Sequence, residues 1–268
     1  MEYQVLTLSD QGYPKRLLER LGEAAPKELY HWGPLDHLNR FTMGVISADS
    51  INGLALMSTN QLLFTIREYD LNYIGGWHSV METEIFRLGL YRKNTTVTLF
   101  TAKGLERETF ETFLETRFYP PLHEFPEREE YFRRAKEGKL LMLSAAPPKQ
   151  GRMTKANIIQ RNWLACVLSD VVFVPYAAKG TKTLAMAKRV FAANIPVFTT
   201  DQESNGQLHR LGIPGLTRKT VGAYLEKLGA KRAQVVKEGP KEVTLSVMEK
   251  PDIPYGAKPK AAQGKLKI

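Results

Sequence analysis

Short apolar runs recur along most of the chain, and each is followed by a longer stretch with helical periodicity. Six runs are candidate strands, at residues 41–47, 71–74, 97–101, 140–144, 171–176 and 195–199. Helices are predicted at about residues 51–68, 78–90, 105–117, 127–137, 154–168, 181–193 and 217–228. Consecutive residues of the strand candidates are apolar, which is typical of strands buried on both faces.

This alternation predicts an α/β fold, a Rossmann-like and mostly parallel sheet with helices on both faces. Residues 41–230 would form this domain. Residues 1–40 are rich in turns and aromatic side chains, and we expect a short N-terminal extension that packs on the domain. Residues 231–268 are mainly Lys, Pro, Gly and Ala, which predicts a flexible basic C-terminal tail whose one strand candidate is 243–248.

The charge balance indicates an acidic partner. The chain has 38 Lys and Arg against 28 Asp and Glu, a formal charge of +10 at pH 7. Nucleic acid is the commonest partner of a soluble basic protein, although about half of this excess lies in the predicted tail.

A single cysteine, Cys166, lies in an apolar helical stretch, so we interpret it as a core thiol in a reducing compartment. No apolar run reaches membrane-spanning length and the first residues do not resemble a signal peptide, so a cytoplasmic protein without a membrane partner is expected. We expect no cofactor, no metal site and no catalytic residues.

Small and polar residues follow three of the predicted strands. These loops contain Ser47, Gly75-Gly76-Trp77 and Lys179-Gly180-Thr181. In an open α/β sheet, ligands bind at the carboxyl ends of the strands, and those ends share one edge. We therefore expect the three loops to converge on one crevice.

The third loop has the layout of a phosphate-binding site. Arg161 comes from the preceding helix, an apolar strand leads to Gly180, and the next helix directs its unsatisfied N–H groups and positive dipole end at the loop. The alternative is that Gly180 and Thr181 only start a helix.

Asn162 is interpreted as a brace between strand ends, because an amide can bond two backbone groups at once. The predicted nucleic-acid- and phosphate-binding residues are Ser47, Gly75, Gly76, Trp77, Lys155, Arg161, Asn162, Lys179, Gly180, Thr181, Lys182 and Thr183.

Two tryptophans lie beside these motifs. An indole that stacks on a base contributes about 1–3 kcal/mol. Trp77 follows two glycines, so we expect it to be exposed and to contact the ligand. Trp163 has two interpretations, a stacking surface or core packing at helical spacing with Val167.

Seven short segments, in order, resemble the DNA-processing protein A family (DprA or Smf). The closest is Gln160-Arg161-Asn162 through Ser169-Asp170, which is similar to the family's Arg-Asn-Arg to Ser-Asp stretch. The others are residues 12–18, 25–33, 74–76, 98–105, 144–148 and, together, 180–181 and 205–208. The resemblance covers about residues 8–215. It implies binding of single-stranded DNA without base specificity, a RecA-type recombinase as partner, help in loading that recombinase, and a homodimer.

The chain also departs from that family. Its first loop keeps Ser47 but has neither the family's glycine nor its arginine, and Ile46 would crowd an approaching backbone. Glu82 stands where the family has an aspartate, Phe86 replaces its histidine, and we expect the basic tail in place of its winged helix. Arg161 and Lys182 are therefore expected to carry charge that relatives spread over two loops.

Two alternatives remain from the residues. One is a nucleotide-sensing regulator on the same fold. The other is an enzyme, because the third loop is similar to the Pro-Gly-Gly-x-Gly-Thr-x-x-Glu loop of the nucleotide phosphoribohydrolases called "lonely guy" proteins. However, no carboxylate follows Thr181 at the required distance. Glu82 follows Gly75-Gly76 at that distance, and His78 and Glu82 are interpreted either as a catalytic pair or, more commonly, as a pair on a helix surface.

Overall fold

The computed structural model describes residues 2–116 and 127–234. The residues up to Ala233 form one compact unit. Residues 235–268, which include nearly all of the predicted tail and its strand candidate at 243–248, lie outside the described residues.

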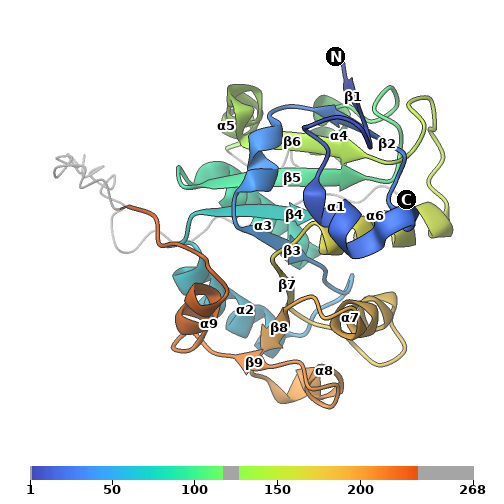
Figure 1. Ribbon diagram of the computed structural model, residues 1–268. Helices are drawn as coiled ribbons and strands as arrows, with labels where there is room; N and C mark the ends of the chain where they lie inside the picture. The colour runs from blue at the N-terminus through green and yellow to red at the C-terminus, as the bar shows by residue number, and fades with distance from the viewer. Residues whose placement is uncertain (1, 117–126, 235–268) are drawn as a thin grey trace, which may run out of the picture. The chain divides into compact units, whose positions relative to one another are not determined.

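A single sheet runs through this unit (Figure 1). Its strands are β1 (Gln4–Thr7), β2 (Glu28–Trp32), β3 (Thr42–Val45), β4 (Leu71–Gly75), β5 (Thr95–Thr101), β6 (Leu140–Ser144), β7 (Val171–Val174), β8 (Val197–Thr200) and β9 (Gly215–Leu216). The nine strands have the order β1-β2-β6-β5-β4-β3-β7-β8-β9. The six predicted strands are confirmed as β3 to β8 and are mutually parallel. The sequence missed β9 because two residues carry no periodicity.

The N-terminal segment joins the same sheet. Strands β1 and β2 pair antiparallel, and β2 pairs antiparallel with β6, so that Tyr30 lies opposite Ser144. The N-terminal extension therefore does more than pack on the domain, because its two strands extend the sheet. The turn-rich surroundings of β2 concealed its alternating pattern of buried and half-buried residues.

Helices follow the parallel strands nearly where they were predicted. The α-helices are α1 (Lys15–Leu21), α2 (Gly53–Ile66), α3 (Val80–Tyr91), α4 (Phe110–Thr116), α5 (Arg128–Arg134), α6 (Lys155–Val167), α7 (Lys182–Ala192), α8 (Gly206–His209) and α9 (Val221–Lys227). Shorter helical turns span Gly22–Ala24, Leu35–Asn39, Ala135–Lys139 and Glu203–Asn205.

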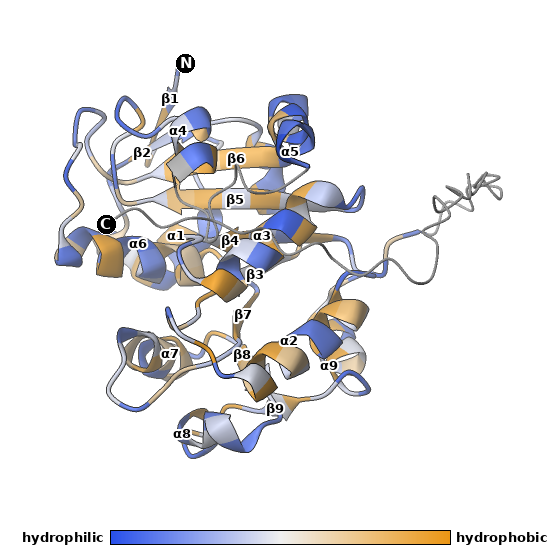
Figure 2. Ribbon diagram, turned by 180° about the vertical axis from the view of Figure 1, so that it is seen from behind, coloured by the Kyte–Doolittle hydropathy of each residue, from blue (hydrophilic) through white to orange (hydrophobic). Residues whose placement is uncertain are grey.

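Two hydrophobic cores lie on opposite faces of the sheet, and Figure 2 shows the apolar character of its strands. Along β7, Val171 and Phe173 belong to one core, whereas Val172 and Val174 belong to the other. Helices α2, α3, α4, α5 and α9 cover the first core, and α1, α6, α7 and α8 cover the second. Both faces of each central strand are thus buried, which confirms the predicted Rossmann-like arrangement.

The Ser169-Asp170 motif fastens the N-terminal segment to the sheet. The Asp170 carboxylate accepts two hydrogen bonds from Arg16 of α1, at 2.6 and 2.8 Å, and one from the backbone N–H of Thr42, at 2.7 Å. Ser169 donates to the carbonyl of Ala165 at 2.8 Å. One carboxylate therefore joins α1, the start of β3 and the start of β7.

We expect Asp170→Ala to lower the free energy of unfolding by about 2 kcal/mol, because Arg16 and the Thr42 N–H lose a charged acceptor. Urea unfolding measures this change. Asp36→Ala is the matched control, since Asp36 is exposed and its loss should change stability by no more than about 0.5 kcal/mol. Equal effects of the two substitutions would contradict the fastening role.

Candidate nucleic-acid interface

The strand order reverses between β3 and β7, which is the usual ligand position of an open α/β sheet. The loops after these strands are bonded together, because Ile46 N–H donates to the Phe173 carbonyl and Ala48 N–H to the Tyr176 carbonyl, both at 3.2 Å. Helices α2, α3, α6 and α7 each follow a parallel strand. Their N-termini therefore lie at this same edge, which we call the carboxyl edge.

Glu82 joins two of the three predicted loops. Its Oε1 accepts the backbone N–H of Ser47 at 2.9 Å, and its Oε2 accepts those of His78 at 2.7 Å and Ser79 at 3.5 Å. Ser79 caps α3 and accepts the N–H of Glu82 in return, a reciprocal capping box. The Glu82 side chain is only 6% exposed. A surface pair between His78 and Glu82 was therefore a wrong interpretation, since His78 precedes α3 and bonds through its backbone.

The surroundings of Glu82 act on its pKa in opposite directions. Burial raises the pKa of the carboxyl, whereas the backbone N–H groups and the charge of Arg161 oppose that rise. Nearby, burial and the Glu82 charge raise the pKa of the Cys166 thiol to about 12. Cys166 is free and buried, which confirms its interpretation as a core thiol.

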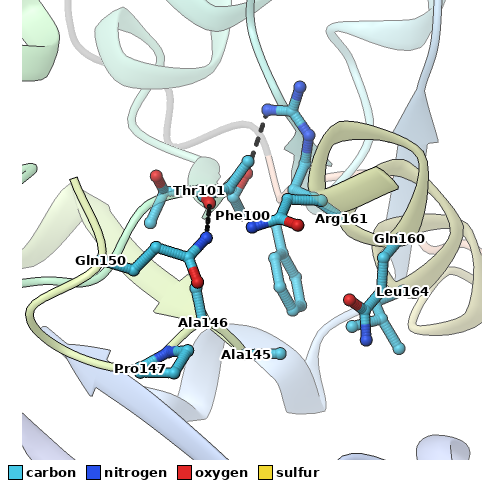
Figure 3. Close-up of a pocket in the computed structure, with 11 residues that line it drawn as sticks. Phe100, Thr101, Ala145, Ala146, Pro147, Gln150, Gln160, Arg161 and Leu164 are labelled. Atoms are coloured by element: carbon cyan, nitrogen blue, oxygen red, sulfur yellow. Dashed lines mark hydrogen bonds between the residues drawn. The ribbon is translucent and has the colours of Figure 1, made fainter. Parts of the chain in front are cut away.

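Arg161 lies inside the molecule rather than on the predicted crevice surface. It is 2% exposed, and its Nη1 donates to the carbonyl of Phe100 at 3.2 Å, as Figure 3 shows. A Cβ at Gly76 would overlap the Arg161 guanidinium, so this glycine provides the room in which the charge lies. Arg161 nevertheless lines a small pocket at this edge, so its predicted phosphate-binding role stays a prediction. A linear motif does not tell which way α6 turns the side chain.

Trp77 is likewise buried. It is 1% exposed, its Nε1 donates to the Thr98 carbonyl at 3.2 Å, and its ring meets Phe86 edge-on with 5.4 Å between centroids. The backbone of Trp77 has a φ of 56°, a left-handed conformation that turns the indole into the core. The expectation of an exposed stacking surface was therefore wrong. Trp163 is half-buried, and Arg189 lies 3.8 Å from its ring centroid.

The loop after β7 starts α7. Gly180 is exposed with a φ of 79°, which glycine adopts readily. The Thr181 hydroxyl accepts the N–H of Leu184 at 3.2 Å and donates to the Ala178 carbonyl at 2.7 Å, so Thr181 is the N-cap. Lys179 and Lys182 are exposed beside it, and Thr183 is half-buried.

The side chains of Ser47, which is buried, and of Asn162 have no hydrogen-bond partner among the described residues. The bracing contact predicted for Asn162 is therefore not made, and the phosphate contact predicted for Ser47 stays a prediction. Asn205 provides the brace instead, with Nδ2 donating to the Pro175 carbonyl at 3.0 Å and to Thr199 Oγ1 at 2.7 Å.

A small pocket of about 110 Å³ opens between the ends of β5 and β6 and the first turns of α6 (Figure 3). Its polar side chains include Thr101, Gln150, Asn157 and Gln160. Gln150 Nε2 donates to the Ala102 carbonyl at 3.4 Å. Arg161 also lines this pocket, and it is the one lining residue that sequence reasoning proposed as a binding residue. Gln150 and Asn157 were not predicted.

Exposed cations follow the carboxyl edge. They are Lys149, Arg152 and Lys155 before and at the start of α6, and Lys179 and Lys182 at the start of α7. No ion pair of these five side chains is recorded in the described part of the chain, whereas Arg133 and Arg134 of α5 both pair with Glu130. Lys149 and Arg152 were not predicted.

The first residues of α6 and α7 reinforce this charge. Each helix begins with a lysine, Lys155 or Lys182, and has no acidic residue in its first turn. A lysine next to the positive end of a helix dipole is unfavourable unless an anion is bound between them. The arrangement therefore favours a polyanionic ligand.

Within residues 2–116 and 127–234, no three His, Cys, Asp or Glu side chains gather closely enough to hold a metal ion. The described helices also lack the length and apolar character that are needed to cross a membrane.

Comparison with known proteins identifies a matching family and solved structures of similar fold. The model of a family described as DNA recombination-mediator protein A matches residues 4–237. No curated protein matches the chain. DNA processing protein A of Streptococcus pneumoniae is similar in structure, with a TM-score of 0.63 and 17% identity over 85% of this chain and 74% of that one. The Helicobacter pylori protein, whose structure is described as showing a unique single-stranded DNA binding mode, gives 0.62 and 17% over 85% and 97%.

We expect Arg161→Ala to lower the free energy of unfolding by about 1.5–3 kcal/mol, because the buried Phe100 carbonyl loses its charged donor beside Gly76. Lys182→Ala is the control from the same predicted set. Since Lys182 is exposed, its replacement should change stability by no more than about 0.5 kcal/mol. Urea unfolding followed by tryptophan fluorescence compares them, and a stable Arg161→Ala protein would contradict the bracing role.

Proposed function

The chain belongs to the DNA recombination-mediator protein A family, and we propose that it binds single-stranded DNA along the carboxyl edge of its sheet, without base specificity. The observation that carries this proposal is the row of exposed cations at the starts of α6 and α7, for which no carboxylate partner is recorded among the described residues. A DNA strand supplies the missing negative charge as a continuous series of phosphates.

The chemistry of the edge supports backbone recognition. Lysine and arginine side chains, together with helix N-termini, bind phosphate oxygens without reading sequence. The amides of Asn157 and Gln160 face the neighbouring pocket and are suited to sugar or base edges. The loop after β3 contributes no cation, since its exposed residues are Asp49, Ser50 and Asn52. The DNA would therefore cross the starts of α6 and α7 rather than the loop after β3.

Catalysis is not part of the proposal. Cleavage of an N-glycosidic bond needs a carboxyl group free to exchange a proton with the substrate. Both oxygens of Glu82 accept backbone N–H groups, and the helix that starts after Thr181 has no acidic residue in its first turn. These contacts favour a binding protein.

The proposal includes the mediator role. The family description and the resemblance suggest that the DNA-bound protein helps to load a RecA-type recombinase, and the resemblance also suggests a homodimer. The edge cations would act first, because DNA must be held before a recombinase is delivered to it.

We expect Lys155→Ala combined with Lys182→Ala to weaken binding of an oligothymidylate about ten-fold or more and to reduce the salt slope of log K by about 1.4, because each lost phosphate contact on a single strand accounts for about 0.7. Fluorescence anisotropy over a salt series measures both quantities.

The matched control is Lys15→Ala combined with Lys227→Ala, which removes the same charge from exposed positions at the opposite side of the sheet. Its salt slope should remain that of the wild type. Equal slopes for the two double variants would contradict the edge as the DNA site. A second assay follows assembly of a recombinase filament on DNA that is covered by single-strand-binding protein. The wild-type protein and the control variant should accelerate this assembly, whereas the Lys155→Ala and Lys182→Ala double variant should not.

A further inference from the structure

The carboxyl edge already contains an anion, the side chain of Glu82. Backbone N–H groups at the crossover of an open α/β sheet commonly hold a ligand phosphate. In this chain the N–H groups of Ser47, His78 and Ser79 point to one carboxylate instead. We propose that Glu82 is a resident anion that fills the nucleotide-phosphate position, so that the site accepts a polynucleotide along its outer edge and excludes free mononucleotides. This inference rests on the proposed function and specifies its substrate class.

The carboxylate is held firmly in this position. Oε1 and Oε2 bond to different loops, and the capping box with Ser79 fixes the first turn of α3 around the side chain. A phosphate could take these N–H groups only if that turn opened. Such an opening would break the cap as well as the contact between the loops after β3 and β4.

The internal charges also exclude a second anion. The Arg161 charge acts on Glu82, while the guanidinium lies against Gly76 and donates to Phe100. A phosphate placed here would meet a buried carboxylate, and repulsion between like charges is strong away from water. The exposed Lys155 and Lys182 lie outside this neutralised group.

Packing closes the same position. Ile46 and Trp77, in the loops after β3 and β4, are buried in the two cores. Gly76, whose open backbone would otherwise suit a close phosphate, is covered by Arg161. A DNA strand can still bind outside this position, because it combines several phosphate contacts along a surface.

The test compares two ligand types on the full-length protein. Labelled oligothymidylate should bind the wild type, and neither thymidine monophosphate nor inorganic pyrophosphate should displace it at equal phosphate concentration. Glu82→Ala should gain saturable pyrophosphate binding, at least about ten-fold tighter than the wild type, by titration calorimetry. Glu84→Ala, which removes a half-buried carboxylate from the same helix, should gain none.

Each outcome bears on the inference. Displacement by thymidine monophosphate from the wild type would overturn it, even if no variant of Glu82 folds. A folded Glu82→Ala protein that gains no pyrophosphate affinity would also overturn it. Glu82→Gln, which keeps one oxygen acceptor, should gain less than Glu82→Ala. If the wild type binds no DNA, the proposed function fails, while the pyrophosphate comparison still decides the role of Glu82.

Discussion

The carboxyl edge depends on one buried carboxylate. Glu82 accepts backbone N–H groups from the loop after β3 and from the loop before α3, and its charge is opposed by Arg161 of α6. Two loops that are far apart in the sequence are therefore held by one carboxylate, and a buried arginine of α6 contributes opposite charge nearby. A buried carboxylate is costly unless its oxygens are hydrogen-bonded, so the N–H groups of these loops are what keeps Glu82 in place.

The burial of Arg161 determines which cations an external anion can reach. Arg161 is used for bracing the ends of β4 and β5, so the accessible cations are those at the first turns of α6 and α7. The structure thus separates two kinds of positive charge that look alike in the sequence. One kind neutralises the interior, and the other is available to a polyanion.

A carboxylate also has a structural role at the amino ends of the parallel strands. Asp170 binds Arg16 and the start of β3, which attaches the N-terminal segment where β1 and β2 continue the sheet. In both places a carboxylate accepts a backbone N–H from another segment of the chain. Arg16 pairs directly with Asp170, whereas at Glu82 the charge of Arg161 acts from nearby. Both motif residues, Arg161 and Asp170, thus have structural contacts of their own.

The sequence by itself determined the parallel strands, the helices between them and the edge at which the loops meet, because runs of apolar residues and helical periodicity are local signals. It also located the exposed lysines at the start of α7. Only the tertiary structure decided that Arg161 and Trp77 turn inward and that Glu82 accepts backbone N–H groups from two loops. Those orientations depend on one left-handed backbone residue, on the space above Gly76 and on the register of neighbouring strands, and none of these is a local property of the chain.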